Sequence, residues 1–270
     1  MTRRLALVTG ASAGIGAAFA KVYASYGFDL ALTARRLDRL EALGAEMTKA
    51  HGAQIIPIAA DLGEPGAVDT ILAAVKAKNR DVDVLVNNAG YGLPGTWLGT
   101  KWPDQARALQ VMLTAPLELS HKVLPSMVAS KWGRIVNVAS LAGLTPGAGG
   151  GHTTYAAIKS ALIKFSQSLN IELEGTGVHC TAVCPGLTWS EFHDLNGTRE
   201  QLKETPDFIW QTADEVAEIG YRAAEHNRAV AVTGLVNKLT AGLAKVIPDP
   251  LAQAISKGAV SRYRNPDSKD

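Results

Sequence analysis

The chain has 270 residues, of which 47% are hydrophobic and 19% are charged, with a formal net charge of +2. This balance is typical of one large globular domain and excludes a disordered or fibrous chain. Because lysine and arginine are spread along the sequence, no concentrated basic surface is expected, which excludes nucleic acid as a partner.

The amino-terminal sequence indicates neither a targeting signal nor a membrane anchor. The apolar run from Leu5 to Val8 is too short for a signal sequence. No stretch approaches the roughly 18 apolar residues that a membrane span needs. Cys180 and Cys184 are too few and too close together for a disulfide framework, and no metal site is expected. We therefore expect a protein of the reducing cytoplasm with no membrane partner.

Short apolar runs alternate with longer segments of helical periodicity, which predicts alternating strands and helices. The expected strands are residues 5–9, 29–33, 55–59, 82–86, 134–138 and 178–183. Strands this continuous in apolar character indicate a parallel sheet that is buried on both faces, with right-handed crossovers placing helices on each side. The sequence thus predicts an α/β fold, a Rossmann-like, doubly wound sheet in three layers.

The sequence shows no internal repeat and no linker before its last part, so residues 1–233 are expected to form one domain. Residues 234–270 are expected to form a helical tail, because apolar positions between 235 and 247 recur at helical spacing with lysines between them. A second amphipathic stretch ends near Tyr263. Packing of the tail on the domain or on a second subunit is favoured over a membrane-surface helix.

A glycine-rich turn, Thr9-Gly-Ala-Ser-Ala-Gly-Ile-Gly16, joins the first expected strand to the following helix. At this point of a parallel sheet, helix amides and the positive end of the helix dipole face a pyrophosphate. Gly10 permits the tight turn, Gly14 allows the backbone to approach the phosphates, and Gly16 allows close packing of helix and strand. The turn therefore predicts a dinucleotide site.

The end of the second expected strand, Ala34-Arg35-Arg36, indicates which dinucleotide is bound. An NAD enzyme would place an acidic residue here for the ribose 2′-hydroxyl, whereas arginine suits a 2′-phosphate. Asp38 lies past the arginines, in the next helix. We assign the phosphate contact to Arg35, with Arg36 as support, so NADP is favoured over NAD; the alternative is that both arginines form a solvated helix start.

Tyr155 and Lys159 are four residues apart in a helical pattern, so their side chains share one helix face. A free phenol titrates near ~10, which is too high for a base at neutral pH. An adjacent ammonium and a positively charged nicotinamide would favour the phenolate. Tyr155 is thus predicted to exchange a proton with a substrate oxygen.

Together these motifs resemble those of the short-chain dehydrogenase/reductase family, in the right order over almost the whole chain. Asn87-Asn-Ala-Gly90 and Pro185-Gly186 are similar to two further turns of that family. The resemblance implies that Lys159 lowers the pKa of Tyr155 and holds the nicotinamide ribose. The cofactor-binding residues that sequence and resemblance predict together are Gly10, Ser12, Ala13, Gly14, Ile15, Gly16, Arg35, Asp61, Leu62, Asn88, Ala89, Tyr155, Lys159, Pro185, Gly186, Thr188 and Ser190.

Ser140 is similar to the family serine that hydrogen-bonds the substrate oxygen, so the resemblance implies a catalytic set of Ser140, Tyr155 and Lys159. One departure concerns the helix before the fifth strand. Met112 stands where the family usually has an asparagine whose backbone carbonyl holds a water linked to the lysine. An altered proton relay or reduced activity would follow from this change.

The expected function is the interconversion of a ketone or aldehyde and its alcohol on a fairly hydrophobic small molecule, with NADP(H) as hydride carrier. The predicted substrate residues are Ser140, His152, Tyr155, Trp189 and Phe192. The alternative is a catalytically weak or silent NADP-binding redox sensor or scaffold. The resemblance also implies a homodimer or homotetramer that pairs through helices near residues 103–130 and 153–173.

Overall fold

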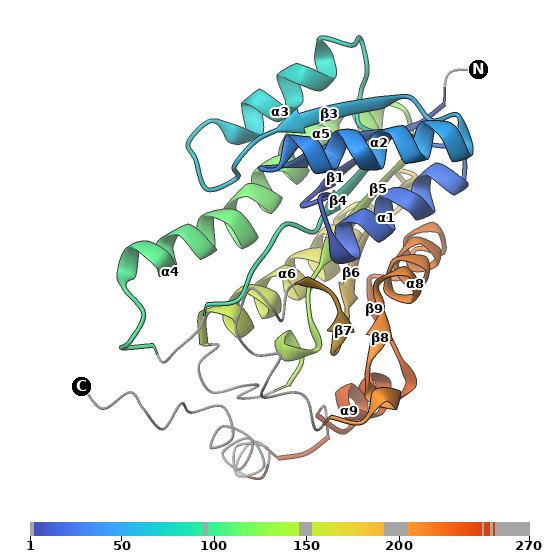
Figure 1. Ribbon diagram of the computed structural model, residues 1–270. Helices are drawn as coiled ribbons and strands as arrows, with labels where there is room; N and C mark the ends of the chain where they lie inside the picture. Colours follow the sequence, from blue (N-terminus) through green and yellow to red (C-terminus); the bar gives the residue numbers. More distant parts are fainter. Residues whose placement is uncertain are drawn as a thin grey trace.

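A computed structural model describes residues 3–93, 97–145, 153–191, 205–244, 246–248 and 251. Seven of its strands form one sheet: β1 (Leu5–Thr9), β2 (Asp29–Ala34), β3 (Ile55–Ala59), β4 (Val84–Asn87), β5 (Gly133–Val138), β6 (Val178–Cys184) and β9 (Val230–Val232). Their order is β3-β2-β1-β4-β5-β6-β9, and every neighbouring pair is parallel (Figure 1). This confirms the predicted Rossmann-like α/β fold.

Two hydrophobic cores, one on each face, explain why the strands are continuously apolar. In β1, Leu5 and Leu7 belong to one core, and Ala6 and Val8 belong to the other. Successive side chains of a strand point to opposite faces, so a strand that is covered on both sides needs apolar residues at every position.

Helices cover both faces of the sheet, which gives the three layers (Figure 1). On one face lie α1 (Gly14–Ser25), α2 (Leu37–His51) and α8 (Ala213–Glu225). On the other face lie α3 (Ala67–Lys76), α4 (Trp102–Leu109), α5 (Ala115–Ala129) and α6 (Thr153–Glu172). Between α4 and α5 the chain stays helical but forms a π-helix, Gln110–Thr114. Such widened turns are rare and often lie at functional sites.

Three short strands do not appear among the six that the sequence predicted. β9 extends the sheet by a seventh strand, and β7 (Thr188–Trp189) pairs with β8 (Gln211–Thr212) in a separate two-stranded sheet. Each has only two or three residues, which is too few for hydrophobic periodicity to register.

The carboxyl-terminal helix α9 (Leu235–Ala244) packs beside the turn that follows β6. Asn237 and Ala241 are its buried residues. A Cβ added at Gly186 would collide with the Asn237 side chain, so this helix lies directly behind the Pro185–Gly186 turn. The second amphipathic stretch of the tail lies outside the described residues. Within the described chain, no helix combines the length and the apolar character needed to cross a bilayer.

Candidate active site

The carboxyl ends of four neighbouring strands bring the predicted site residues to one edge of the sheet. β1, β4, β5 and β6 lie side by side and run in the same direction (Figure 1). They end at Thr9, Asn87, Val138 and Cys184. In open α/β sheets, ligands bind in the crevice outside this edge.

The glycine turn connects β1 to α1 at this edge, and its geometry requires glycine. Gly10 and Gly14 have φ angles of +66° and +54°, which side chains rarely tolerate. A Cβ at Gly16 would collide with the Gly10 carbonyl oxygen and the Asn88 amide, and one at Gly14 would stand 3.0 Å from the Ser190 Cβ. No side chain caps the start of α1. The first amides of α1 are therefore left for an anion.

The turn after β4 braces the glycine turn. The Thr9 hydroxyl oxygen accepts the backbone N–H groups of Asn88 and Ala89, at 2.9 and 3.1 Å. In return, the Asn88 amide nitrogen donates to the carbonyl oxygens of Thr9 and Gly10, at 3.0 and 3.3 Å. Asn88, which the resemblance places against the cofactor, thus also fixes the shape of the turn itself.

Arg36, one of the two arginines that the sequence indicated, lies at the glycine turn together with Arg39. The side chain of Arg36 donates to the Ser12 hydroxyl at 3.0 Å and pairs with Glu191 at 3.2 Å. Arg39, one turn along α2, pairs with Glu191 at 2.7 Å. Arg35 is exposed and has no ion pair with a described residue. Arg36 thus contacts the glycine turn, and the assignment of the 2′-phosphate contact to Arg35 stays a prediction. The helical spacing of Arg36 and Arg39 could have indicated the second arginine, whereas no sequence signal pointed to Glu191.

Asp61 and Leu62, two of the predicted cofactor-binding residues, follow β3. The Asp61 carboxylate accepts the Gly63 N–H at 2.9 Å and an Arg107 N–H at 2.6 Å. Arg107 comes from α4 and also pairs with Glu64. Leu62 is buried. The position of Asp61 is therefore set by a residue of α4 that sequence reasoning missed.

Tyr155 and Lys159 lie on the same face of α6, as their spacing predicts. The Lys159 ammonium stands 5.4 Å from the centre of the Tyr155 ring. It donates a hydrogen bond of 2.7 Å to the carbonyl oxygen of Val138, the last residue of β5. The side chain is buried, and this burial lowers the pKa of Lys159 to about 8. The ammonium is thus held at a fixed point beneath the phenol.

Ser140 lies beside Tyr155 although fifteen residues separate them in the sequence. The Ser140 hydroxyl oxygen accepts the Ala142 N–H at 3.1 Å, which orients the hydroxyl. Burial raises the pKa of Tyr155 to about 12, and a hydrogen bond from Ser140 opposes this rise. The sequence and the resemblance led us to expect a lowered pKa for Tyr155. Burial outweighs the other contributions because it removes water from the phenolate.

Cys184, the last residue of β6, lies near the same lysine. Burial raises the pKa of this thiol to about 12, while Lys159 and the Ser140 backbone N–H act in the opposite direction. Cys180 is also buried, and neither cysteine forms a disulfide. Cys184 is therefore an uncharged neighbour of the candidate catalytic residues.

Met112 lies within the π-helix and contacts the turn after β4. Its sulfur accepts the Tyr91 N–H at 3.4 Å, and a Cβ at Gly90 would stand 3.2 Å from the sulfur. The side chain is 1% exposed. Met112 thus packs under the Asn-Asn-Ala-Gly turn and holds its far end.

The segment after β6 carries the remaining predicted contacts. Pro185 and Thr188 are buried, and Ser190 lies against Gly14. Trp189 is 45% exposed, and its ring stacks on Trp210 with centroids 4.1 Å apart. The other predicted substrate contacts, His152 and Phe192, lie outside the described residues.

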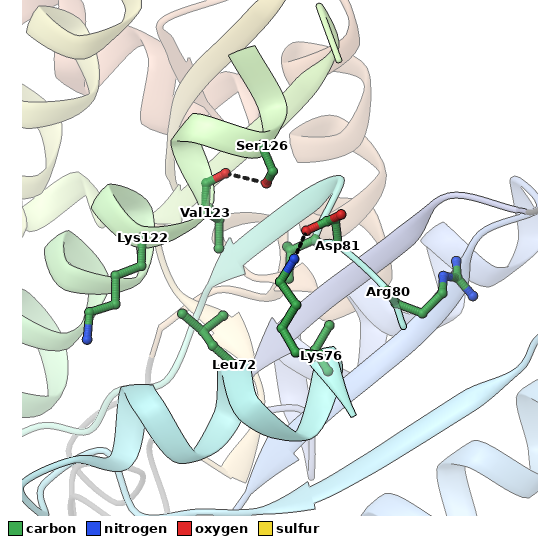
Figure 2. A pocket seen from close by; sticks show the side chains of 9 residues that line it. Leu72, Lys76, Arg80, Asp81, Lys122, Val123 and Ser126 are labelled. Atoms are coloured by element: carbon green, nitrogen blue, oxygen red, sulfur yellow. Dashed lines mark hydrogen bonds and ion pairs between the residues drawn. The ribbon is translucent and has the colours of Figure 1, made fainter. Parts of the chain in front are cut away.

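The opposite edge of the sheet holds a small hollow between α3 and α5 (Figure 2). Lys76 and Asp81 pair at its rim, and Lys122 lines its side. Val82 also lines the hollow and comes just before β4. The hollow therefore lies at the amino end of the strands, away from the predicted site residues. Among the described residues, no group of three His, Cys, Asp or Glu side chains is placed to hold a metal ion.

Curated relatives are similar over most of the chain. A short chain dehydrogenase of Pseudocercospora fijiensis is 40% identical over 192 residues, which cover 70% of this chain and 60% of that protein. Serine 3-dehydrogenase of Agrobacterium fabrum is 34% identical, over 87% of this chain and 95% of that one. The NADP-dependent 3-hydroxy acid dehydrogenase of Salmonella typhi is 35% identical, over 68% and 72% of the two chains.

Solved structures agree with this similarity. A short-chain dehydrogenase from Sphingobium yanoikuyae in complex with NADPH has a TM-score of 0.77 at 30% identity, covering 99% of both chains. A bulky-bulky ketone specific alcohol dehydrogenase from Comamonas testosteroni has a TM-score of 0.75 at 25% identity, covering 99% of this chain and 98% of that one. A 3-oxoacyl-[acyl-carrier protein] reductase with bound NAD from Brucella melitensis has a TM-score of 0.74 at 26% identity, covering 86% and 90%.

The model of the family described as short chain dehydrogenase matches residues 4–201, which include every strand from β1 to β7. With the parallel sheet, the braced glycine turn and the relatives above, this match shows that the chain belongs to the short-chain dehydrogenase/reductase family.

Proposed function

We propose that this chain is an NADP(H)-dependent oxidoreductase that interconverts a ketone or aldehyde and the corresponding alcohol on a fairly hydrophobic small molecule. The observation that carries the proposal is the grouping of Ser140, Tyr155 and Lys159 at the carboxyl edge of the sheet, beside the glycine turn. These groups can donate a proton, steady a developing negative charge and hold a positive charge nearby. A purely structural role would not require all three.

In the reductive direction, NADPH bound at the glycine turn would supply a hydride for the carbonyl carbon. Tyr155 gives its phenolic proton to the carbonyl oxygen, so the carbonyl gains two electrons and two hydrogens and becomes an alcohol. A phenol with a pKa of about 12 carries this proton at neutral pH. Ser140 stabilises the charge that develops on the oxygen, and Lys159 stabilises the tyrosinate until solvent returns the proton.

The glycine turn and its surroundings fit a dinucleotide phosphate. Its positive φ angles and the exclusion of side chains at Gly14 and Gly16 leave backbone amides at the start of α1. Ser12 and Arg36 offer adjacent donors for a 2′-phosphate, and the Glu191 carboxylate beside Arg36 supports the binding of an anion there. The relative named NADP-dependent and the neighbour bound to NADPH support NADP, although another neighbour holds NAD.

Aromatic side chains that come soon after β6 and before α8 support the proposed substrate class. Trp189 and Trp210 present stacked aromatic surface beside the Pro185–Gly186 turn. Concave sites with such walls bind substrates by hydrophobic contact and orient them with a few polar groups. We infer a carbonyl compound with an apolar or aromatic portion.

A catalytically silent NADP-binding sensor is the second candidate, because Met112 replaces the usual asparagine at the π-helix. The two candidates differ in one experiment. NADPH oxidation is followed with a panel of aryl and alkyl ketones and aldehydes for the wild type and for Tyr155→Phe. The enzyme predicts turnover that Tyr155→Phe lowers by about 10²-fold or more while NADPH affinity is retained. Tight NADPH binding without turnover across the panel would favour the sensor.

We further propose a cytoplasmic homodimer or homotetramer that pairs through the helices between residues 103–130 and 153–173. Residues 234–270 would then serve as an extension that packs on domain 1–233 or on a neighbouring subunit. Light scattering on the purified protein measures the assembly directly, and a monomer at micromolar concentration would contradict the proposed pairing.

A further inference from the structure

Glu191 lies between two arginines at the place that the proposed function assigns to the 2′-phosphate. One carboxylate oxygen pairs with both terminal nitrogens of Arg36 at 3.2 Å, and the other pairs with Arg39 at 2.7 Å. One of these two Arg36 nitrogens, Nη2, also donates to the Ser12 hydroxyl at 3.0 Å. We call Arg36 and Arg39 the arginine pair. Its donors therefore converge on a single anion, and in this structure that anion belongs to the chain itself.

The backbone places this carboxylate beside the phosphate-binding turn. Glu191 comes two residues after β7, and Ser190 lies against Gly14 at the start of α1. The side chains of Arg36, Arg39 and Glu191 are each between 41% and 43% exposed. An anion arriving from solvent therefore has access to the same guanidinium groups.

We propose that Glu191 determines cofactor specificity, because its carboxylate competes with the 2′-phosphate of NADP(H) for the arginine pair and so reduces the preference for NADP(H) over NAD(H). This inference rests on the proposed function, which places the 2′-phosphate at Ser12 and Arg36. NAD(H) has a hydroxyl in place of that phosphate, so it binds without disturbing the ion pairs of Glu191.

The charges give the direction of the effect. The arginine pair carries two positive charges, and Glu191 neutralises one of them in the free protein. A 2′-phosphate carries about −1.5 to −2 charges near neutral pH, so it gains from the full charge of the pair and is repelled by a carboxylate within it. Because these groups are half exposed, water and salt weaken the effect, and we expect it to change affinity by about three- to tenfold.

The experiment compares dissociation constants of NADPH and NADH, and of adenosine 2′,5′-bisphosphate and AMP, for the wild type and Glu191→Gln. Glu191→Gln keeps the side-chain size and removes the charge. The matched control is Glu218→Gln, which removes a partly exposed carboxylate that pairs with Arg222 on α8, far from the glycine turn in the sequence. Binding is measured by calorimetry at low and high salt, so no turnover is required.

We expect Glu191→Gln to tighten NADPH and adenosine 2′,5′-bisphosphate by about three- to tenfold, to leave NADH and AMP within about twofold, and to lose this difference at high salt. Glu218→Gln should change none of the four dissociation constants. Unchanged binding, or equal weakening of phosphorylated and unphosphorylated ligands, would overturn the inference and make Glu191 a structural contact. Failure of the wild type to bind any of the four would instead contradict the proposed function.

Discussion

The Lys159 ammonium is hydrogen-bonded to the carbonyl oxygen of Val138 at 2.7 Å, which ties α6 to the end of β5 directly beneath Tyr155. This bond fixes the direction of the lysine side chain before any ligand arrives. It also keeps a charged group away from water, so the protonation of Lys159 is coupled to the stability of the fold.

Stability should therefore rise with pH in a window set by Lys159. Its pKa falls from 10.5 to about 8 on folding, so the unfolded chain binds more protons between these values. Unfolding then becomes less favourable as pH rises through the window, by up to about 3 kcal/mol. The free energy of unfolding is measured by urea titration for the wild type and for Lys159→Met, each at pH 7 and at pH 10. The buried thiols oppose this gain in both proteins, because their raised pKa values lower stability at high pH. The difference in stability between wild type and variant should therefore grow in favour of the wild type from pH 7 to pH 10; parallel curves would contradict it.

The two neighbouring arginines should differ in their effect on the cofactor. Arg36 contacts Ser12 at the glycine turn, whereas Arg35 is exposed. We expect Arg36→Gln to weaken NADPH binding about tenfold or more and to change NADH binding little, because a charge-assisted hydrogen bond to the phosphate is lost. Arg35→Gln serves as the neighbouring control and should cost less than about threefold. A larger effect of Arg35→Gln would contradict this expectation and support the assignment that the sequence favoured.

A single methyl group in the glycine turn should deform it. A Cβ at Gly16 would collide with the Gly10 carbonyl oxygen and the Asn88 amide. We expect Gly16→Ala to cost about 1–3 kcal/mol of stability and to abolish measurable cofactor binding. Gly242→Ala is the control, since Gly242 is exposed within α9 with open space around it. That change should be neutral or stabilise by up to about 1 kcal/mol. Equal thermal unfolding and NADPH binding in the two variants would refute the steric argument.

Both thiols should be unreactive in the folded protein. Burial raises the pKa values of Cys180 and Cys184 to about 12, so almost no thiolate exists at neutral pH. We expect iodoacetamide to label the native protein far more slowly than the protein in guanidinium chloride, as counted by mass spectrometry. Rapid labelling of one thiol in the native state would mean that its strand end opens to solvent.

The sheet was predictable from sequence because its strands are buried on both faces. Leu5 to Thr9 and Val178 to Cys184 are apolar at almost every position, and this pattern is visible without coordinates. β9 was missed because its apolar residues number only three, too few for periodicity to indicate a strand. The π-helix at Met112 was equally hidden, since its backbone widens without a glycine or proline inside it.

For the site, the sequence was informative where the spacing of two residues fixes their geometry. It was uninformative where a residue's role depends on how far the fold buries or exposes it. Tyr155 and Lys159 had to share a helix face once the helix was recognised. In contrast, no pattern distinguishes Arg35 from Arg36 at the end of a strand, because the choice depends on which residue turns toward Ser12. The raised pKa of Tyr155 was also inaccessible, since it depends on how completely the surrounding chain excludes water.

The hydroxyl of Thr9 accepts backbone hydrogens from two residues that follow it by about eighty positions. Two distant parts of the chain must therefore meet before the mouth of the crevice acquires its shape. Once they have met, that mouth is preorganised, and an arriving dinucleotide does not pay the entropy of ordering it. The rigidity of this rim is a product of folding rather than of ligand binding.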